Sequence, residues 1–146
     1  MSADSSTGGQ SGELSDLLDL RMPAESKAIA KVTDAISETL TQLEIPEEKR
    51  LEIALAVQEA LANAVVHGCK SDPSKEVRCR LQRDSRGGIV VIVTDPGPGF
   101  SPAMLSDPKQ SERLYADHGR GVFLIRQLMD EVHFEHGGNQ VKMRKY

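Results

Sequence analysis

A helix predicted over residues 51–68 constrains this chain most. It carries polar side chains among the apolar residues that should face the protein core. Its apolar residues recur at the spacing of an amphipathic helix: Leu51, Ala54, Leu55, Leu61, Ala62, Val65 and Val66. Glu59, Asn63 and His67 follow at intervals of four, which makes them neighbours on one face. A partly desolvated carboxylate and carboxamide cost free energy unless something pairs with them. The plain alternative is a solvated polar stripe, and the helix alone does not decide between the two.

The composition excludes several classes of protein. The 146 residues suffice for one domain with a real core. The net charge of −4 gives no electrostatic footprint for nucleic acid or for an anionic membrane. No apolar run approaches the roughly 20 residues that span a bilayer, and the first residues lack the features of a secretory signal. Cys69 and Cys79 form no CxxC pattern and are predicted to be reduced structural thiols. We therefore expect a cytoplasmic protein with no direct nucleic-acid or membrane partner.

The other elements are predicted from hydrophobic period and from Pro and Gly boundaries. Residues 1–14 are rich in Ser and Gly and are expected to form a disordered tail, and residues 15–146 a single domain. Gly68 is expected to cap its helix in the left-handed conformation. The order strand, two helices, two strands, long loop, helix, two strands predicts an α+β fold with helices on one face of a mixed, mostly antiparallel sheet. The predicted strands are 17–22, 76–82, 89–94, 132–136 and 140–145, and the other helices are 24–43 and 121–129.

A first glycine motif, Asp95-Pro96-Gly97-Pro98-Gly99-Phe100, directly follows the apolar strand 89–94. Glycine is needed where backbone bends sharply or where a ligand lies against it. A carboxylate at a strand end beside such a turn can accept a hydrogen bond from the amino group of a flat ligand. An ordinary Pro/Gly turn with a solvated Asp remains the alternative at this point.

A second motif, His118-Gly119-Arg120-Gly121, opens the predicted helix 121–129. Free N–H groups and the positive dipole end at a helix N-terminus form a ready anion site. A lone GxG is weak evidence by itself. The sequence contains no P-loop pattern, and the glycines after Thr94 lack the spacing of a dinucleotide-binding fingerprint.

The combination of these segments is more specific than any one of them. EALANAVVHG, DPGPGF and HGRGVFLIRQLMDEV, in that order, resemble the bacterial serine/threonine-kinase anti-sigma factors of the GHKL superfamily of histidine-kinase-like ATPases. The resemblance covers about residues 17–146. It implies a Bergerat-type two-layer sandwich that binds ATP and Mg²⁺, with the loop between the two glycine motifs as the ATP lid.

The resemblance also implies roles for individual residues. Glu59 would be the general base for a substrate serine or threonine, and Asn63 would hold the Mg²⁺. Asp95 would bond the adenine amino group, with Gly97 and Gly99 shaping that pocket. Backbone groups of Gly119, Arg120 and Gly121 would contact the phosphates. Asn139 stands where many members carry a Thr that helps to bind adenine, and Asn can also donate and accept a hydrogen bond.

As partners, the resemblance implies an alternative sigma factor and an anti-sigma-factor antagonist that the protein phosphorylates. The first helix, with Lys31 as a candidate contact, would belong to the partner surface. Family members are often dimers, so the resemblance also implies a possible homodimer. The main alternative is a non-catalytic ATP-binding switch that only docks regulatory partners, against which Glu59 argues. A further alternative is the catalytic piece of a histidine kinase or of a GHKL hydrolase. Against it, the given sequence predicts neither a separate phosphoacceptor helix nor a long transducer domain.

Overall fold

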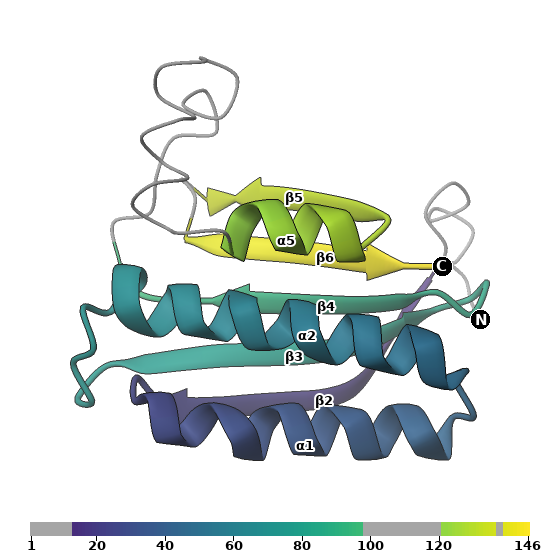
Figure 1. Cartoon of the computed structure of the whole chain (residues 1–146), viewed down its shortest axis with the longest axis horizontal. Coiled ribbons are helices and arrows are strands. Elements are labelled where there is room, and N and C mark those ends of the chain that lie inside the picture. The colour runs from purple at the N-terminus through teal and green to yellow at the C-terminus, as the bar shows by residue number, and fades with distance from the viewer. Residues whose placement is uncertain (1–12, 98–120, 137–138) are drawn as a thin grey trace.

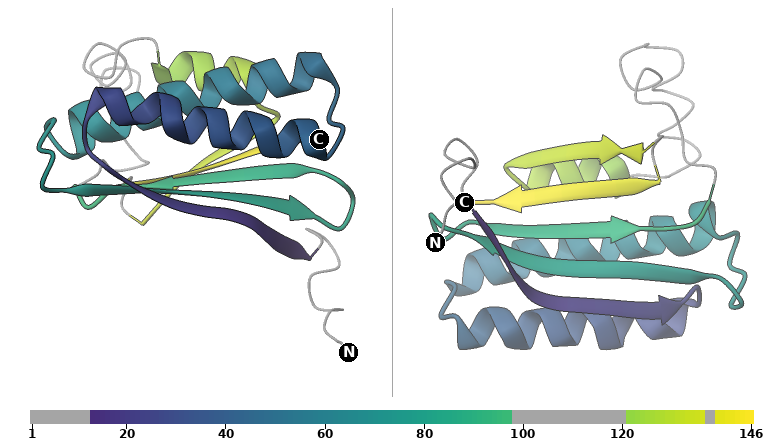
Figure 2. Two further views of the ribbon diagram at one scale, coloured as in Figure 1. Left: turned by 90° about the horizontal axis from the view of Figure 1, so that it is seen from below. Right: turned by 180° about the vertical axis from the view of Figure 1, so that it is seen from behind.

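The computed structural model describes residues 13–97, 121–136 and 139–146, and these form two layers, a sheet and a set of helices on one of its faces (Figures 1 and 2). The strands are β2 (Leu14–Pro23), β3 (Glu76–Asp84), β4 (Ile89–Thr94), β5 (Glu131–Glu135) and β6 (Gln140–Lys145). The helices are α1 (Ser26–Gln42), α2 (Glu47–Asn63) with the π turn η1 (Ala64–Gly68), and α5 (Gly121–Leu128). The predicted α+β class is confirmed.

The sheet has the strand order β2-β3-β4-β6-β5. All four pairings among these strands are antiparallel, so the mixed sheet expected from the sequence is fully antiparallel over the described residues. β4 lies at the centre, which explains why its residues read as one continuous apolar run. The β3–β4 turn precedes the first residue of β4, and Asp95 follows its last residue. The turn and Asp95 therefore lie at opposite ends of the sheet.

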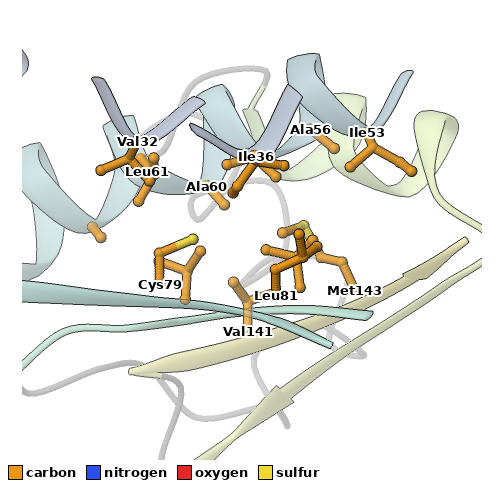
Figure 3. Packing of buried hydrophobic residues seen from close by; sticks show 14 of the residues in the cluster. Val32, Ile36, Ile53, Ala56, Ala60, Leu61, Cys79, Leu81, Val141 and Met143 are labelled. Carbon is orange, nitrogen blue, oxygen red and sulfur yellow. The ribbon is translucent and has the colours of Figure 1, made fainter. Parts of the chain in front are cut away.

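The helices cover one face of the sheet with an apolar core (Figure 3). In α1 the buried residues are Val32, Ile36 and Leu40, which recur at four-residue intervals and confirm the predicted amphipathic helix. The strands contribute alternate residues, such as Val77, Cys79 and Leu81 of β3. Burying one large apolar side chain in this way contributes about 1.5–3 kcal/mol to the free energy of folding.

The buried face of α2 differs from the predicted one. Its buried residues are Ile53, Ala56, Val57, Ala60 and Leu61, and Ala64 and Val65 continue them into η1. By contrast, Leu51, Leu55 and Val66 of the predicted stripe are 64%, 40% and 47% exposed. The reason is that α2 has apolar residues on most of its sides and lies between α1 and α5, so the contacts with these helices, not the period alone, select the buried face.

Two local expectations, one for the end of the helical segment and one for the cysteines, are settled by the structure. Gly68 is not in the left-handed region, so the predicted cap is wrong; Lys70 and Ser71, just beyond it, have φ of 55° and 56°. Cys69 and Cys79 are both free and buried, which confirms the expected structural thiols. The expected tail falls almost wholly on residues 1–12, and the expected lid on residues 98–120, outside the described residues.

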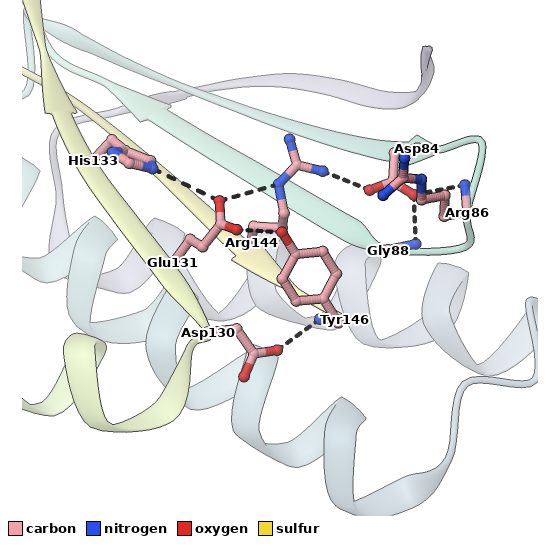
Figure 4. Close-up of polar contacts among 8 residues, drawn as sticks. All are labelled: Asp84, Arg86, Gly88, Asp130, Glu131, His133, Arg144 and Tyr146. Carbon is pink, nitrogen blue, oxygen red and sulfur yellow. Dashed lines mark hydrogen bonds and ion pairs between the residues drawn. The ribbon is translucent and has the colours of Figure 1, made fainter. Parts of the chain in front are cut away.

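A polar network lies at the end of the sheet that carries the β3–β4 turn (Figure 4). The buried Asp84 accepts a hydrogen bond from the Gly88 N–H (2.8 Å) and forms an ion pair with Arg144 Nη1 (2.5 Å). Arg144 Nε also approaches Glu131, which accepts a hydrogen bond from the Tyr146 hydroxyl. This network fixes the turn to the last strand. Among the described residues, no helix has the length and apolar character needed to cross a membrane.

Candidate functional site

The C-terminal end of α2 positions the polar side chains singled out in the sequence. Glu59 and Asn63 lie one helical turn apart in the regular part of α2, and both are half-buried. In the described part of the chain neither side chain takes part in a hydrogen bond or an ion pair. His67 lies in the π turn beyond Asn63. The α-helical geometry that was predicted to place all three side chains on one face therefore holds only for Glu59 and Asn63.

The π turn carries the chain from α2 toward the end of β4. Its wider hydrogen bonding is seen where the Cys69 N–H donates to the carbonyl of Ala64, five positions earlier. Such single π turns are found frequently at functional sites. Here the turn brings Gly68 against Asp95: a Cβ on Gly68 would lie 2.4 Å from the Asp95 Cγ.

Asp95 begins the turn after β4, and the backbone around it is closely packed. A Cβ on Gly97 would lie 2.1 Å from the Gly68 carbonyl oxygen. The Gly97 N–H donates to Asp95 Oδ1 (2.7 Å), and the Asp95 N–H donates to the carbonyl of Asn139 (2.9 Å). The requirement for glycine at position 97, expected from the sequence, thus has a steric cause.

The Asp95 carboxylate is poorly solvated. Burial raises its pKa above that of an ordinary Asp, and the hydrogen bond from the Gly97 N–H opposes this rise only in part. Its second oxygen, Oδ2, has no hydrogen-bond donor among the described residues. A carboxylate of this kind can accept a hydrogen bond from a ligand that brings its own donor.

Asn139 lies beside the same turn. Its Nδ2 donates a long hydrogen bond to the Gly97 carbonyl (3.4 Å), and its Oδ1 is buried without a partner in the part of the chain that the structure describes. A buried acceptor of this kind costs free energy until a donor reaches it. The position that the sequence singled out therefore lies next to Asp95 and Gly97.

The start of α5 meets α2 at Asn63. A Cβ on Gly121 would lie 2.9 Å from Asn63 Nδ2 and 3.1 Å from Oδ1, so the absence of a side chain at 121 lets the two helices approach. Three segments distant in sequence therefore converge: the end of α2, the turn after β4 and the start of α5 (Figure 1). Gly99, Gly119 and Arg120 lie outside the described residues.

One residue of this arrangement was missed in the sequence. Gly68 was interpreted as a helix cap, whereas its contact is with Asp95. No spacing signal could have found it, because the contact joins two segments that only the fold brings together.

The comparison with known protein families decides which family this fold and site belong to. Residues 22–145 match the family model of the histidine kinase-like ATPase domain. The chain belongs to this family. The match covers all the described elements apart from most of β2, and it confirms that the resemblance inferred from the three sequence motifs holds for the histidine-kinase-like ATPases.

Curated proteins that are similar to the chain include two that are named serine-protein kinase RsbW. The Bacillus subtilis (strain 168) protein is 28% identical over 138 residues, which cover 90% of this chain and 86% of the relative. The Staphylococcus aureus (strain MSSA476) protein is 24% identical over 138 residues, with 90% and 87% covered.

Two solved structures share the fold. One contains the RsbU and RsbW domains of Rv1364c from Mycobacterium tuberculosis, with a TM-score of 0.58 and 20% identity; the match covers 88% of this chain and 32% of that one. The other is the histidine kinase domain of the blue-light-activated histidine kinase EL346 from Erythrobacter litoralis, with a TM-score of 0.53 and 21% identity; it covers 84% and 60%.

The residues present fit the nucleotide that the family name implies. The site offers a desolvated carboxylate, a buried unpartnered amide oxygen and glycines at points of closest approach. For the metal, no cluster of three or more His, Cys, Asp or Glu ligands occurs among the described residues. Asn63 could supply one oxygen ligand, which fits Mg²⁺ in kind, since this hard ion takes oxygen ligands and usually keeps several waters beside the substrate phosphates.

Proposed function

We propose that the protein is an ATP-dependent serine/threonine protein kinase that acts as an anti-sigma factor in a partner-switching pathway. In this proposal it sequesters an alternative sigma factor and phosphorylates an anti-sigma-factor antagonist. The observation that most supports the proposal is the convergence at Gly68, Asp95 and Gly121, which brings the helix with Glu59 and Asn63 against the first glycine motif and against the last residue of the second. The names of the curated relatives support the kinase class.

Each residue is proposed to act through its own chemistry. Glu59 accepts the proton of the substrate hydroxyl, and Asn63 holds Mg²⁺, which neutralises charge on the ATP phosphates when bound. Asp95 accepts a hydrogen bond from the adenine amino group. Phosphoryl transfer depends mainly on positioning and charge neutralisation, so a base and a metal ligand one turn apart on a rigid helix suit it.

The remaining roles complete the nucleotide pocket. We assign Gly97, Gly99 and Asn139 to the adenine end, and the backbone of Gly119, Arg120 and Gly121 to the phosphates. The fold supports this division, because Gly97 and Asn139 contact each other beside Asp95 while Gly121 lies against Asn63.

The decisive experiment separates binding from transfer. Proteins that bind the chain are first captured from its native cells with and without ATP. The captured antagonist is then incubated with the chain and γ-labelled ATP. We expect Glu59→Gln to bind ATP with unchanged affinity in calorimetric titration but to transfer label about 10²–10⁴-fold more slowly, the usual contribution of a general base.

Glu48→Gln serves as the matched control, because Glu48 lies exposed in the first turn of the same helix, away from Asn63. It should leave transfer unchanged. Undiminished transfer by the Glu59 variant would remove Glu59 as the base and favour the non-catalytic switch. An unchanged ATP dissociation constant for Asp95→Asn would remove Asp95 from the adenine end.

A further inference from the structure

One neighbouring residue leaves no room for a side chain at position 68. The Gly68 backbone is outside the left-handed region, so the backbone conformation itself would accept an L residue. What excludes a side chain is Asp95: the Cβ of an alanine at position 68 would lie 2.4 Å from Cγ and 2.5 Å from each carboxylate oxygen. Ordinary contacts begin at 3.4 Å, so the carboxylate or the turn would have to move by about 1 Å.

The carboxylate is confined on its other side as well. The Gly97 N–H donates to Asp95 Oδ1, and a Cβ on Gly97 would lie 2.9 Å from this same oxygen. Gly97 is itself in contact with the Gly68 carbonyl. Asp95 therefore lies between two glycines of different segments, and Oδ2 receives no hydrogen bond from the described residues.

We propose that Gly68 is a positioning residue that sets the place of the Asp95 carboxylate, and through it the preference for a purine that carries an exocyclic amino group. This inference rests on the proposed function. Gly68 ends the continuous helical segment that carries Glu59 and Asn63, so the contact fixes the adenine end of the site relative to the phosphate end. An interaction that depends on one hydrogen bond is sensitive to a shift of about 1 Å, because hydrogen bonds weaken steeply away from their best geometry.

The test compares ATP with ITP, which has a carbonyl oxygen in place of the adenine amino group. Dissociation constants for both nucleotides are measured by calorimetry on the full chain. We expect Gly68→Ala to reduce the preference for ATP over ITP about tenfold or more, toward the value of Asp95→Ala. The double variant Gly68→Ala/Asp95→Ala should match Asp95→Ala alone, because the carboxylate that the added methyl group displaces is then absent.

Gly88→Ala is the matched control. A Cβ on Gly88 would lie 2.6 Å from Asp84 Oδ2, so this glycine also adjoins a carboxylate, but at the opposite end of β4. Like Gly68, it is outside the left-handed region. The control should lower the melting temperature and leave the preference for ATP unchanged.

The outcomes are distinguishable. If Asp95→Ala leaves the ATP preference intact, the adenine role in the proposed function is wrong. If Asp95→Ala abolishes the preference while Gly68→Ala keeps it, the positioning role is overturned and the adenine role stands. If Gly68→Ala does not fold, the double variant decides: recovery of a cooperative thermal transition supports the contact with Asp95, and equal loss of folding contradicts it.

Discussion

Two Arg–Asp ion pairs of nearly the same length allow the effect of burial to be measured within one molecule. Arg144 Nη1 lies 2.5 Å from Asp84 Oδ2, and the two side chains are 9% and 2% exposed. Arg78 Nη2 lies 2.6 Å from Asp19 Oδ2, but these side chains are 37% and 46% exposed. We compare Asp84→Ala with Asp19→Ala: each removes the carboxylate of an Arg–Asp pair, which is buried in the first case and exposed in the second.

The structure sets the size of the expected difference. Removing Asp84 leaves a guanidinium buried without its main partner, which costs about 3–5 kcal/mol. Asp84 Oδ1 also accepts hydrogen bonds from the N–H groups of Arg86 (2.9 Å) and Gly88 (2.8 Å), so the β3–β4 turn is loosened as well. For a chain of this length the loss corresponds to roughly 10–15 °C in Tm. Exposed pairs contribute little, so Asp19→Ala should change Tm far less.

Unfolding by urea and by heat, followed by circular dichroism, measures both effects on the full chain. Nucleotide affinity serves as the check on integrity, because Asp84 lies at the other end of the sheet from Asp95 and its loss should leave ATP binding unchanged at temperatures where the variant is folded. Equal losses of stability in the two variants would refute the argument that Asp84, through its buried ion pair and its turn hydrogen bonds, contributes more to stability than the exposed Asp19.

Further expectations concern the core, the helix surface, a thiol and the pH dependence of binding. Ile36→Ala should lower the free energy of unfolding by about 2–5 kcal/mol in urea titrations, because its side chain is fully buried. Leu51→Gln should change the same quantity by no more than about 0.5 kcal/mol, since Leu51 is 64% exposed. Burial raises the pKa of the Cys79 thiol to about 12, so a thiol reagent near neutral pH should label it only after unfolding. If Asp95 binds adenine as a carboxylate, ATP affinity should fall on acidification, and its raised pKa places this fall at a higher pH than for an ordinary Asp. In a pH series of titrations, Asp95→Asn should remove this step.

The local pattern of the sequence was enough to locate most elements. The strands 89–94 and 140–145 were predicted with the bounds that the structure has, because a continuous apolar run and a glycine-bounded alternating run leave little ambiguity. The first strand begins at Leu14, three residues before its predicted start, since the polar and exposed Ser15 and Asp16 separate Leu14 from the apolar run. The order of these elements then determined the two-layer class.

What the sequence could not provide was the choice between neighbours in space. Leu51 and Leu55 are as apolar as Ile53 and Leu61, so only the positions of α1 and α5 explain which of them are buried. The same holds for Gly68, whose partner Asp95 is reached through the π turn. The contact of Asn139 with Gly97 also depends on β4 and β6 being paired in one register.

The place of β6 between β4 and β5 affects how the molecule is made. During synthesis the apolar strand Ile89–Thr94 acquires its first neighbour, β3, early, but its second neighbour, β6, emerges after all the other described strands. Until then one edge of the most apolar strand has no partner, and β5 has no strand to join. Bare edges of this composition are prone to intermolecular pairing. The nascent chain therefore passes through a stage of synthesis in which protection by chaperones should determine how much of it reaches the native state.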